Sequence, residues 1–527
     1  NPLFAIELFR ALPGGAQGVS GTLSTLIHDR VQALSEPAVE VLRWASVLGS
    51  GFDLERLERV SELPADAVAS GVEALQRHGL IQANASEQAT GTYRFSHDVV
   101  RRAVYAELSE PRRRMLHRRV AERLEPLLGG DETLAADVVH HGALAGRPEI
   151  SARACLRAAQ RCVRLFASTE AEALVRRAFY HTQQLPVAER VKLDVELWRV
   201  RLDARRPLES EGAGGEIERL GELALDHGLE DCARLAFHML AWLRWEEGAA
   251  SDALAFSLRA EVLSRNLTDA ERTAALAESA RCLVLLENDL SSAEALVLEA
   301  QARAARSGIS PMAIPDALGM LAWHRGELRK AAAWFAEARA IARREADRTN
   351  EFQALEHALC VLFELDDLAA ARLVAAELGE LAAKLRGGSE APVARVFAAL
   401  LEYAGGAHGE LESSLEALRA ADAKQRLVYA QLRAAEMDLE HGRIELAAAR
   451  AREALGAATV LSRNSDIALA RSVLVRAARA RGQLEPVAGE LLALATLSLG
   501  KLSERARLAA ENVIGHGRSE RASQADS

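Results

Sequence analysis

The chain has 527 residues, of which 49% are hydrophobic, 4% aromatic and 27% charged, which excludes wholesale disorder and a small disulfide-stapled scaffold. Its formal net charge of −10 provides no overall basic field for nucleic acid or an anionic membrane. The five cysteines lie far apart without a CxxC pair, which favours reduced thiols and a cytoplasmic protein. No run of 18 apolar residues indicates a membrane span, and the abundance of Ala and Leu predicts a mostly α-helical chain.

The first part of the sequence predicts several short helices followed by a β-hairpin. Helices are expected over Thr22–Leu34, from an N-cap at Ser35 through Val47, from Asp53 through Val60, and over Asp66–His78 with Gly79 at the C′ position. The polar stretch Asn84–Thr92 separates Leu80-Ile81 from Tyr93-Arg94-Phe95, which indicates two antiparallel strands, and Ser96 would cap the next helix. This order is typical of a winged-helix domain, which we place at residues 22–128.

From residue 129 to residue 514 the sequence predicts a repeat of helical hairpins. A turn-favouring residue recurs every 33 to 43 positions, with a small residue five positions later where the next helix would pack closely. The pairs are Gly248/Ala253, Asn288/Ala293, Gly326/Ala331, Asp366/Ala371, Gly409/Ser414 and Gly442/Ala447, with Gly482/Val487 as a weaker continuation. Twelve positions after the turns stand Ala260, Ala300, Ala338, Ala421 and Ala454, a further set of close-packing positions. The pattern predicts an α-solenoid, and a polar segment at residues 515–527 is expected to form a disordered tail.

One unit of the repeat resembles a known motif. Over Asp316–Ala342, the residues Gly319, Gly326, Ala331, Phe335 and Ala338 have the spacing of a tetratricopeptide repeat. The expected fold class is therefore mostly α, with a small winged-helix domain followed by an α-solenoid of tetratricopeptide-like helical hairpins. Solenoids of this kind present extended concave surfaces to their partners.

The sequence offers no motif for catalysis or for metal binding. The only Gly-Lys pair, Gly500-Lys501, is followed by Leu502, so no phosphate-binding loop of the GxxxxGK[ST] form exists. The first lysine is Lys192, and neither an HExxH metal motif nor a GxSxG nucleophile motif is present. We therefore predict that the chain is not an enzyme by itself, with no catalytic residues and no metal site.

A cluster of arginines stands out within the acidic chain. Between Arg94 and Arg123 there are nine arginines and four acidic residues. Its densest part comprises Arg112, Arg113, Arg114, Arg118 and Arg119. These residues would bind DNA phosphates, or else pair with acids of a neighbouring domain or a nucleotide phosphate. The absence of base-reading Asn or Gln on a recognition helix disfavours DNA.

Two segments resemble the signal-transduction ATPases called STAND proteins, a class of AAA-related NTPases. Residues 1–8, Asn-Pro-Leu-Phe-Ala-Ile-Glu-Leu, look like the end of an ATPase module, which we assign to residues 1–21. Residues 94–105, Arg-Phe-Ser-His-Asp-Val-Val-Arg-Arg-Ala-Val-Tyr, resemble the winged-helix motif of that class, with Ser96 in place of a methionine. The resemblance implies that Pro2 contacts the adenine and that His97, with Asp98, senses the nucleotide phosphates. Alternatively, His97 only belongs to a helix start.

The expected function follows from these elements and from the resemblance. The chain, which begins at Asn1, would be part of a longer parent protein, such as a large LuxR-type regulator with an upstream ATPase domain. It would form the sensor arm of a cytoplasmic bacterial signalling or transcription regulator, with ATP or ADP bound only by the parent. A protein or small-molecule effector would bind the concave face of the repeats, and no membrane is involved. The alternatives are a stand-alone repeat scaffold for protein interactions and DNA binding by the basic winged helix.

Overall fold

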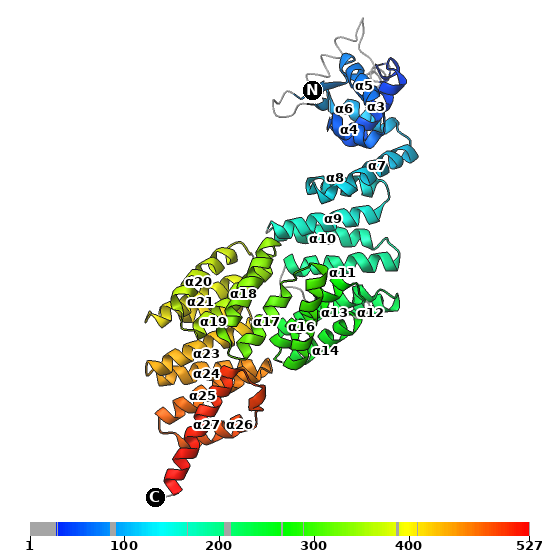
Figure 1. Ribbon diagram of the computed structural model, residues 1–527. Helices are drawn as coiled ribbons and strands as arrows, with labels where there is room; N and C mark the ends of the chain where they lie inside the picture. The colour runs from blue at the N-terminus through cyan, green and yellow to red at the C-terminus, as the bar shows by residue number, and fades with distance from the viewer. Residues whose placement is uncertain are drawn as a thin grey trace. The chain divides into compact units, whose positions relative to one another are not determined.

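The computed structural model describes residues 28, 30–84, 91–165, 167–204, 212–264, 267–287, 289–385, 389–407 and 409–525. It divides into two compact units (Figure 1). The first unit comprises Asn1–Arg161 and Ala173–Pro186, and the second comprises Cys162–Glu172 and Val187–Ser527. The expected ATPase element at residues 1–21, including Pro2, and most of the helix expected over residues 22–34 lie outside the described residues.

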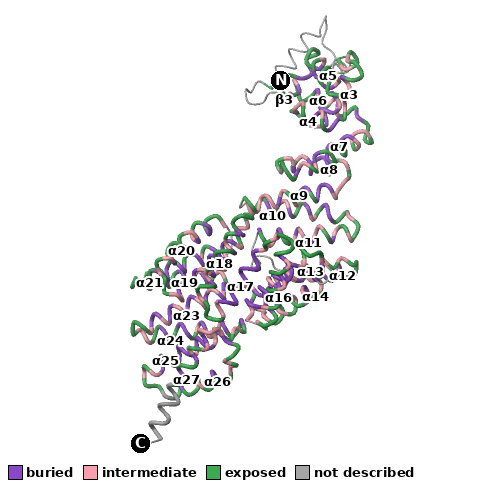
Figure 2. The backbone as a smooth tube through the Cα atoms, in the orientation of Figure 1, coloured by how far each residue is buried: buried purple, intermediate pink, exposed green. Residues whose placement is uncertain are grey.

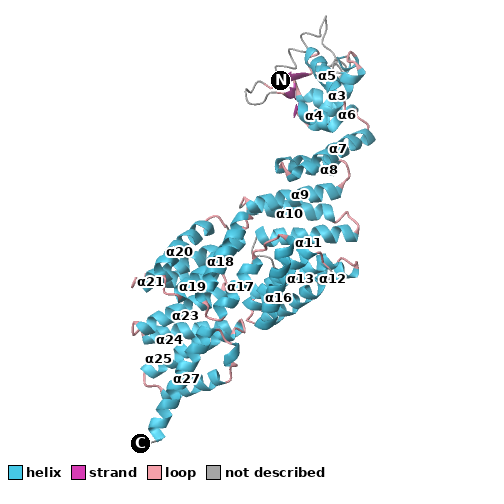
Figure 3. Ribbon diagram, viewed as in Figure 1, coloured by secondary structure: helices cyan, strands magenta, loops and turns pink. Residues whose placement is uncertain are grey.

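The first unit begins with a winged-helix arrangement. Its elements are, in order, α3 (Glu36–Leu48), β1 (Gly51–Asp53), α4 (Leu54–Ser61), α5 (Ala65–Arg77), β2 (Ile81–Ala83), β3 (Thr92–Phe95) and α6 (Asp98–Glu107). The strands form an antiparallel sheet in the order β1-β3-β2, in which Ile81 pairs with Phe95 and Phe52 with Tyr93 (Figure 3). Trp44 and Leu75 are buried in the core under this sheet. The predicted hairpin is confirmed, and β1 is an additional strand.

The helix starts in this domain agree with the predicted caps except at α6. Asp53 caps α4, since its Oδ1 accepts a hydrogen bond from the Arg56 backbone N–H at 2.6 Å. The prediction that Ser96 caps the following helix is wrong, because the N-cap is His97, in extended conformation. Ser96 instead prolongs the strand pairing, as its backbone N–H donates to the Leu80 carbonyl at 3.0 Å. The helix therefore begins one residue later than expected.

Further helices complete the first unit and lead into the repeats. They are α7 (Glu110–Leu124), the 3-10 turns η1 (Glu125–Gly129) and η2 (Glu132–Leu134), α8 (Ala135–Leu144), α9 (Pro148–Arg164) and α10 (Ser168–Thr182). The C-terminal end of α9 and the N-terminal end of α10, which lie within Cys162–Glu172, belong to the second unit.

The second unit is an array of helical hairpins. The pairs are α11 (Val187–Ala204) with α12 (Ala213–Asp226), α13 (Glu230–Glu247) with α14 (Ala250–Leu263), α15 (Asp269–Leu285) with α16 (Leu290–Ser307), α17 (Ala313–His324) with α18 (Leu328–Arg344), α19 (Arg348–Glu364) with α20 (Leu368–Ala382), α21 (Glu390–Ala404) with α22 (Leu411–Ala420), α23 (Lys424–Glu440) with α24 (Ile444–Val460), and α25 (Asn464–Ala480) with α26 (Leu484–Ala495). After them comes η5 (Leu499–Lys501), and then α27 (Glu504–Ala525) packs against α25. Buried and exposed positions alternate along these helices (Figure 2). The predicted tetratricopeptide-like solenoid is confirmed.

The predicted turn residues lie between the two helices of their hairpins. Left-handed backbone conformations occur at Gly248, Gly326, Asp366, Gly442 and Gly482. Asn288 lies outside the described residues, and in the α21–α22 turn the left-handed residue is Gly406 rather than Gly409. The small residues five positions later are buried, namely Ala253, Ala293, Ala331, Ala371, Ser414 and Ala447. Among the later close-packing positions, Ala260, Ala300, Ala338 and Ala454 are buried, whereas Ala421 is only half-buried because it follows the end of the short α22.

The unit resembling a tetratricopeptide repeat shows why a glycine stands at its centre. A Cβ atom on Gly319 of α17 would lie 2.6 Å from Cε1 of Phe335 on α18. Real Cβ atoms do not approach that closely, so only glycine lets the two helices pack with the Phe335 ring between them. Phe335, Ala331 and Ala338 are fully buried at this contact. The sequence spacing thus corresponds to the packing of one hairpin.

The array also contacts itself over a long sequence distance. Gln425 of α23 donates a hydrogen bond from Nε2 to the Trp245 carbonyl of α13 at 2.8 Å, across 180 residues. Arg463, before α25, pairs with Glu287, after α15, at 3.1 Å. The Gly326 turn lies against Glu504 of α27, since a Cβ there would be 2.9 Å from the Glu504 Cγ. Each contact joins one hairpin to the element five hairpins further along, so the superhelix returns to itself in the second unit.

The C-terminal helix α27 continues to Ala525, beyond residue 515, although the sequence predicts a disordered tail over residues 515–527. Ala, Arg and Glu in this segment favour a helix. Side chains are described only up to Gly515. None of the described helices combines the length and the apolar character that a membrane crossing requires.

Candidate functional site

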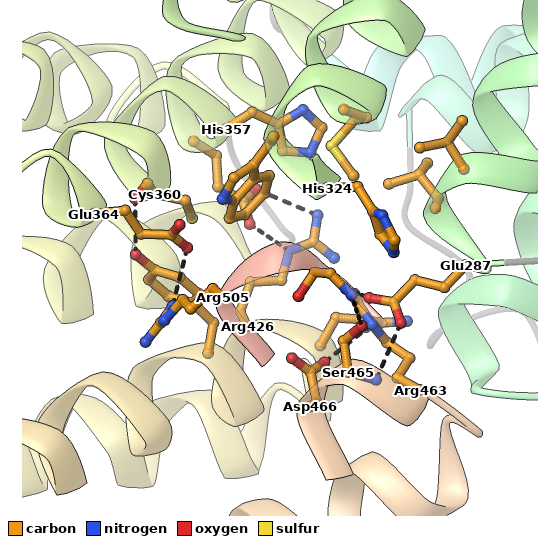
Figure 4. A pocket seen from close by; sticks show the side chains of 18 of the residues that line it. Glu287, His324, His357, Cys360, Glu364, Arg426, Arg463, Ser465, Asp466 and Arg505 are labelled. Atoms are coloured by element: carbon orange, nitrogen blue, oxygen red, sulfur yellow. Dashed lines mark hydrogen bonds and ion pairs between the residues drawn. The ribbon is translucent and has the colours of Figure 1, made fainter. Parts of the chain in front are cut away.

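A pocket lies on the inner wall of the superhelix in the second unit. It has a cavity volume of about 110 Å³, and its wall is built by the first helix of successive hairpins, α13 through α25, together with the start of α27 (Figure 4). One water needs only roughly 10–15 Å³ of such space, so the pocket has room for a group of side-chain size. The first helices are suited to this place because they pack between neighbouring hairpins; α15, for example, is buried at every position from Ser279 to Leu285.

Ion pairs between different helices line the pocket. Arg426 of α23 donates to both carboxylate oxygens of Glu356 on α19, at 2.9 and 3.3 Å, and its guanidinium lies over the Trp245 ring. Arg505 of α27 pairs with Glu364 at 2.9 Å and with Glu436 at 2.6 Å. Bidentate arginine–carboxylate pairs of this type fix geometry as well as charge. The pocket wall is therefore held together by charged contacts between hairpins.

A second charged group, the Glu287–Arg463 junction, joins the turn after α15 to the start of α25. The Arg463 guanidinium lies 3.1 Å from Glu287 and 3.0 Å from Asp466, and the Ser465 backbone N–H donates to Glu287 at 3.2 Å. Burial raises the pKa of Asp466, and the neighbouring Glu287 adds to this while Arg463 opposes it. Burial also disfavours the charge on Glu287, but Arg463, His324 and Ser465 together outweigh it and lower the pKa of that carboxyl. Two half-buried carboxylates thus share one guanidinium.

Two polar groups in the pocket wall lack hydrogen-bond partners. The Nε2 atom of His324, the last residue of α17, is buried and has no partner in the described part of the chain. Burial, opposed by Glu287, lowers the pKa of its imidazole. The Nε atom of Arg463 is likewise buried without a hydrogen-bond partner in the described residues, although it lies 3.0 Å from the Asp466 carboxylate in their ion pair. Figure 4 shows His324, Glu287 and Arg463 pointing into the same part of the pocket. Buried polar atoms are usually satisfied, so these groups indicate a place where another molecule binds.

A buried network supports the pocket from behind. Asp316 of α17 is fully buried and accepts a hydrogen bond from Arg281 Nε of α15 at 2.7 Å. Its other oxygen lies 3.0 Å from Nδ1 of His357 on α19, which also lines the pocket. Because an ionised carboxylate can only accept, the His357 ring carries its proton on Nδ1. Three consecutive first helices are connected by this network.

The predicted nucleotide-sensing residues lie at the start of α6. His97 is exposed, and its side chain forms no cap bond to the helix. Asp98 is exposed as well and pairs with Arg101 at 2.8 Å and Arg102 at 2.6 Å. Hydrogen bonds from Arg101 and then Arg102 lower the pKa of Asp98, so it is a carboxylate at neutral pH. The His97 imidazole is therefore accessible to a ligand or to another part of the protein.

The predicted basic cluster is largely matched by acids of the same domain. Arg112 pairs with Glu40, Arg114 with Glu110 at 2.7 Å, Arg118 with Glu122 at 3.8 Å, and Arg119 with Glu62 at 3.8 Å. Arg113 donates to the Leu108 carbonyl at 2.9 Å and lies over the Tyr105 ring. The partners were expected in a neighbouring domain or on a nucleotide, whereas the structure places them within the first unit. These pairs reduce the positive field available to nucleic acid.

The second helix of the helix-turn-helix, α5, also lacks the charge that phosphate contacts need. Its exposed residues include Asp66 and Glu73 against a single Arg77. Helix-turn-helix proteins place this helix in the major groove, between phosphates, where acidic side chains are repelled. The exposed face of α5 therefore disfavours DNA.

The pocket residues were missed by sequence reasoning. A usable signal was present, because charged residues such as Glu356 and Arg426 interrupt otherwise apolar first helices. Their meeting, however, depends on superhelical contacts across 70 to 180 residues, which no local spacing reveals. Within the described ranges, no three His, Cys, Asp or Glu side chains are grouped in a way that could hold a metal ion.

The comparison with family models agrees with the winged-helix part of this architecture. A family model of a winged helix-turn-helix domain matches residues 34–108, while no curated protein matches the chain. A signal transduction ATPase with numerous domains and a tetratricopeptide repeat sensor, from Pyrococcus horikoshii, is 15% identical, with 94% of this chain and 68% of that one covered at a TM-score of 0.37. A Rap protein complexed with competence and sporulation factor is 13% identical (60% and 99% covered, TM-score 0.40), and Naa15/Naa10 bound to HypK is 11% identical (87% and 88% covered, TM-score 0.23). Residues 34–108 are thus a winged helix-turn-helix domain, which a tetratricopeptide-like solenoid follows.

Proposed function

We propose that this chain is the sensor and regulatory arm of a cytoplasmic ATP-dependent signalling or transcription regulator. The observation that supports the proposal best is the pocket on the inner wall of the repeats, with its buried charges and two unpartnered polar groups. Catalysis is not part of the proposal for this chain, and ATP or ADP would be bound by an ATPase domain of the parent protein. An effector, either a small molecule or a segment of a protein, would bind the pocket.

The wall of the pocket supports a regulatory role because its parts come from distant hairpins. Glu287 and Arg463 are 176 residues apart in sequence and meet only through the superhelix. A ligand that contacts Glu287 or Arg463 alters the ion pair that joins two distant hairpins. If the ligand has a higher affinity for one conformation of the solenoid, it shifts the population towards that conformation. Binding is thereby converted into a change in the array.

The winged helix would couple this change to the nucleotide. His97 is exposed at the N-terminus of α6, where backbone N–H groups favour anionic ligands. Its imidazole would donate a hydrogen bond to a phosphate of the bound nucleotide in one state of the regulator only. The alternative function, a stand-alone scaffold for protein interactions, would use the repeats without any nucleotide control. No observation favours DNA binding as a second function.

Replacing His97 with alanine tests the coupling. In the natural protein that carries this chain, we expect His97→Ala to weaken ADP binding by about tenfold or more, the size of one hydrogen bond to a charged group. The matched control is His78→Ala, which removes an exposed imidazole at the end of α5. Isothermal titration with ADP measures both. Equal ADP affinities for the two variants and the unchanged protein would contradict the switch and leave the scaffold role.

A further inference from the structure

We propose that the pocket binds a cationic amino group, an inference that rests on the proposed sensor role and names the chemistry of the effector. The wall of the pocket contains four carboxylates, Glu287, Glu356, Glu364 and Asp466, but only three guanidiniums, Arg426, Arg463 and Arg505. The carboxylates of the wall therefore outnumber its guanidiniums by one, which leaves an excess of negative charge. A buried charge without a partner is costly, so a cation from the ligand is favoured.

The distribution of ion pairs shows where the cation belongs. Arg426 is fully engaged by Glu356, and Arg505 is shared between Glu364 and Glu436. At the junction, by contrast, Glu287 and Asp466 share the guanidinium of Arg463, and Glu287 also accepts hydrogen bonds from Arg463 and from the Ser465 backbone N–H. Asp466 is therefore the carboxylate with the least compensation, and it is the attachment point of the amino group.

The hydrogen-bonding needs of the wall point to the same chemistry. The buried Nε2 of His324 has no hydrogen-bond partner among the described residues, and Asp466 shares the Arg463 guanidinium with Glu287. An ammonium group has three N–H donors and no acceptor, so it can satisfy a carboxylate and a neutral imidazole nitrogen together. An anionic group would have to displace a carboxylate from its arginine, and a neutral group would leave the charge excess in place.

Aromatic side chains provide the rest of the surface. Trp323, Phe397 and Tyr429 line the pocket, with ring centroids 6.4 Å apart for Trp323 and Tyr429 and 5.9 Å for Phe397 and Tyr429. Aromatic faces attract cations and cover the alkyl chain that carries them. The ligand is thus an alkyl ammonium, whose source is either a free amine or the lysine side chain of a peptide.

Titration calorimetry on the whole chain tests the proposal with two probes. The first is 1,4-diaminobutane, and the second is the tripeptide Gly-Lys-Gly blocked at both ends. We expect at least one probe to bind and the same peptide with an acetylated lysine not to bind. Binding of the diamine alone identifies a free amine as the source, and binding of the peptide alone identifies a lysine side chain.

Matched variants locate the binding. Asp466→Asn should weaken the binding probe by tenfold or more, whereas Glu380→Gln, which removes an exposed carboxylate on α20, should leave it within twofold. His324→Phe should also weaken binding of the probe, because it removes the imidazole nitrogen that would accept from the ammonium group. Circular dichroism checks the helix content of each variant. The proposal is overturned if neither probe binds up to roughly 10 mM, or if Asp466→Asn binds as tightly as the unchanged chain. Such a failure leaves the His97 experiment unaffected, because that experiment measures nucleotide affinity.

Discussion

Replacing Asp316 with alanine should lower the free energy of unfolding of the second unit by about 3–5 kcal/mol. Asp316 is fully buried, and Arg281 is 3% exposed, so the variant leaves a buried guanidinium without its carboxylate. Burial opposes the charge on Asp316, but Arg281 and His357 outweigh it and lower the pKa of this carboxyl to about 2. The pair is therefore ionised at neutral pH, and losing one partner is costly. Urea unfolding followed by circular dichroism measures the change.

Asp252→Ala is the control for the Asp316 experiment. Asp252 is exposed on α14, so its removal should change the free energy of unfolding by less than about 0.5 kcal/mol. A His357→Phe variant should fall between the two, because Arg281 then keeps its carboxylate. If Asp316→Ala were as mild as Asp252→Ala, the buried network would not be the link between α15, α17 and α19 that the geometry indicates.

Lowering the pH from 7 to 4 should destabilise the first unit by about 3 kcal/mol for each histidine of a buried pair. The Nδ1 atoms of His117 on α7 and His141 on α8 lie 2.7 Å apart, and the Tyr105 hydroxyl lies 2.8 Å from His117 Nε2. In the neutral pair, one ring donates its Nδ1–H to the Nδ1 atom of the other ring. A further proton would place two N–H groups against each other, so protonation of the pair is disfavoured. Burial, followed by His140 and Arg113, lowers the pKa of His117 to about 4, and burial lowers that of His141 to about 3.

The sign of this pH dependence follows from where the protons bind. Both folded pKa values lie below the unfolded value of 6.5, so the unfolded chain binds more protons over this range. The stabilisation is complete above pH 6.5 and is lost as the pH falls through 6.5 towards 4 and 3. Amide hydrogen exchange of α7 and α8, corrected for intrinsic rates, measures it. In a His117→Phe, His141→Leu variant, the stability of α7 and α8 should fall less steeply as the pH is lowered. If stability fell equally steeply with pH in both proteins, the histidine pair would not be the origin of the pH dependence.

The sequence predicted those elements that depend on local patterns. Asp53 and Gly79 marked the ends of helices in the winged-helix domain, because caps act within one turn. Gly319 and Phe335 identified a hairpin, since their contact recurs at a fixed spacing. Strand β1 escaped prediction because three residues carry no periodicity, and its pairing with β3 is made 40 residues further along the chain.

The parts that could not be predicted depend on long-range contacts. For the basic cluster, the sequence predicted pairing with acids of a neighbouring domain or with a nucleotide phosphate, because Glu40 and Glu62 reach Arg112 and Arg119 from distant parts of the sequence. The pocket escaped prediction for the same reason, since Glu287 and Arg463 meet only after the superhelix has returned to itself. A charged residue in an apolar first helix was the available signal, but its partner could be named only from the folded chain.

The ADP affinity of an Arg463→Ala variant of the natural protein tests most directly whether the pocket of the repeats controls the nucleotide state. The substitution removes the charged contact between Glu287 and α25 without touching the winged helix, and coupling of about 1–3 kcal/mol predicts a change in ADP affinity of fivefold or more. Arg476→Ala, at an exposed position on the same helix, should leave the affinity within twofold. An unchanged ADP affinity for Arg463→Ala, in a protein that keeps its helix content, would contradict the claim.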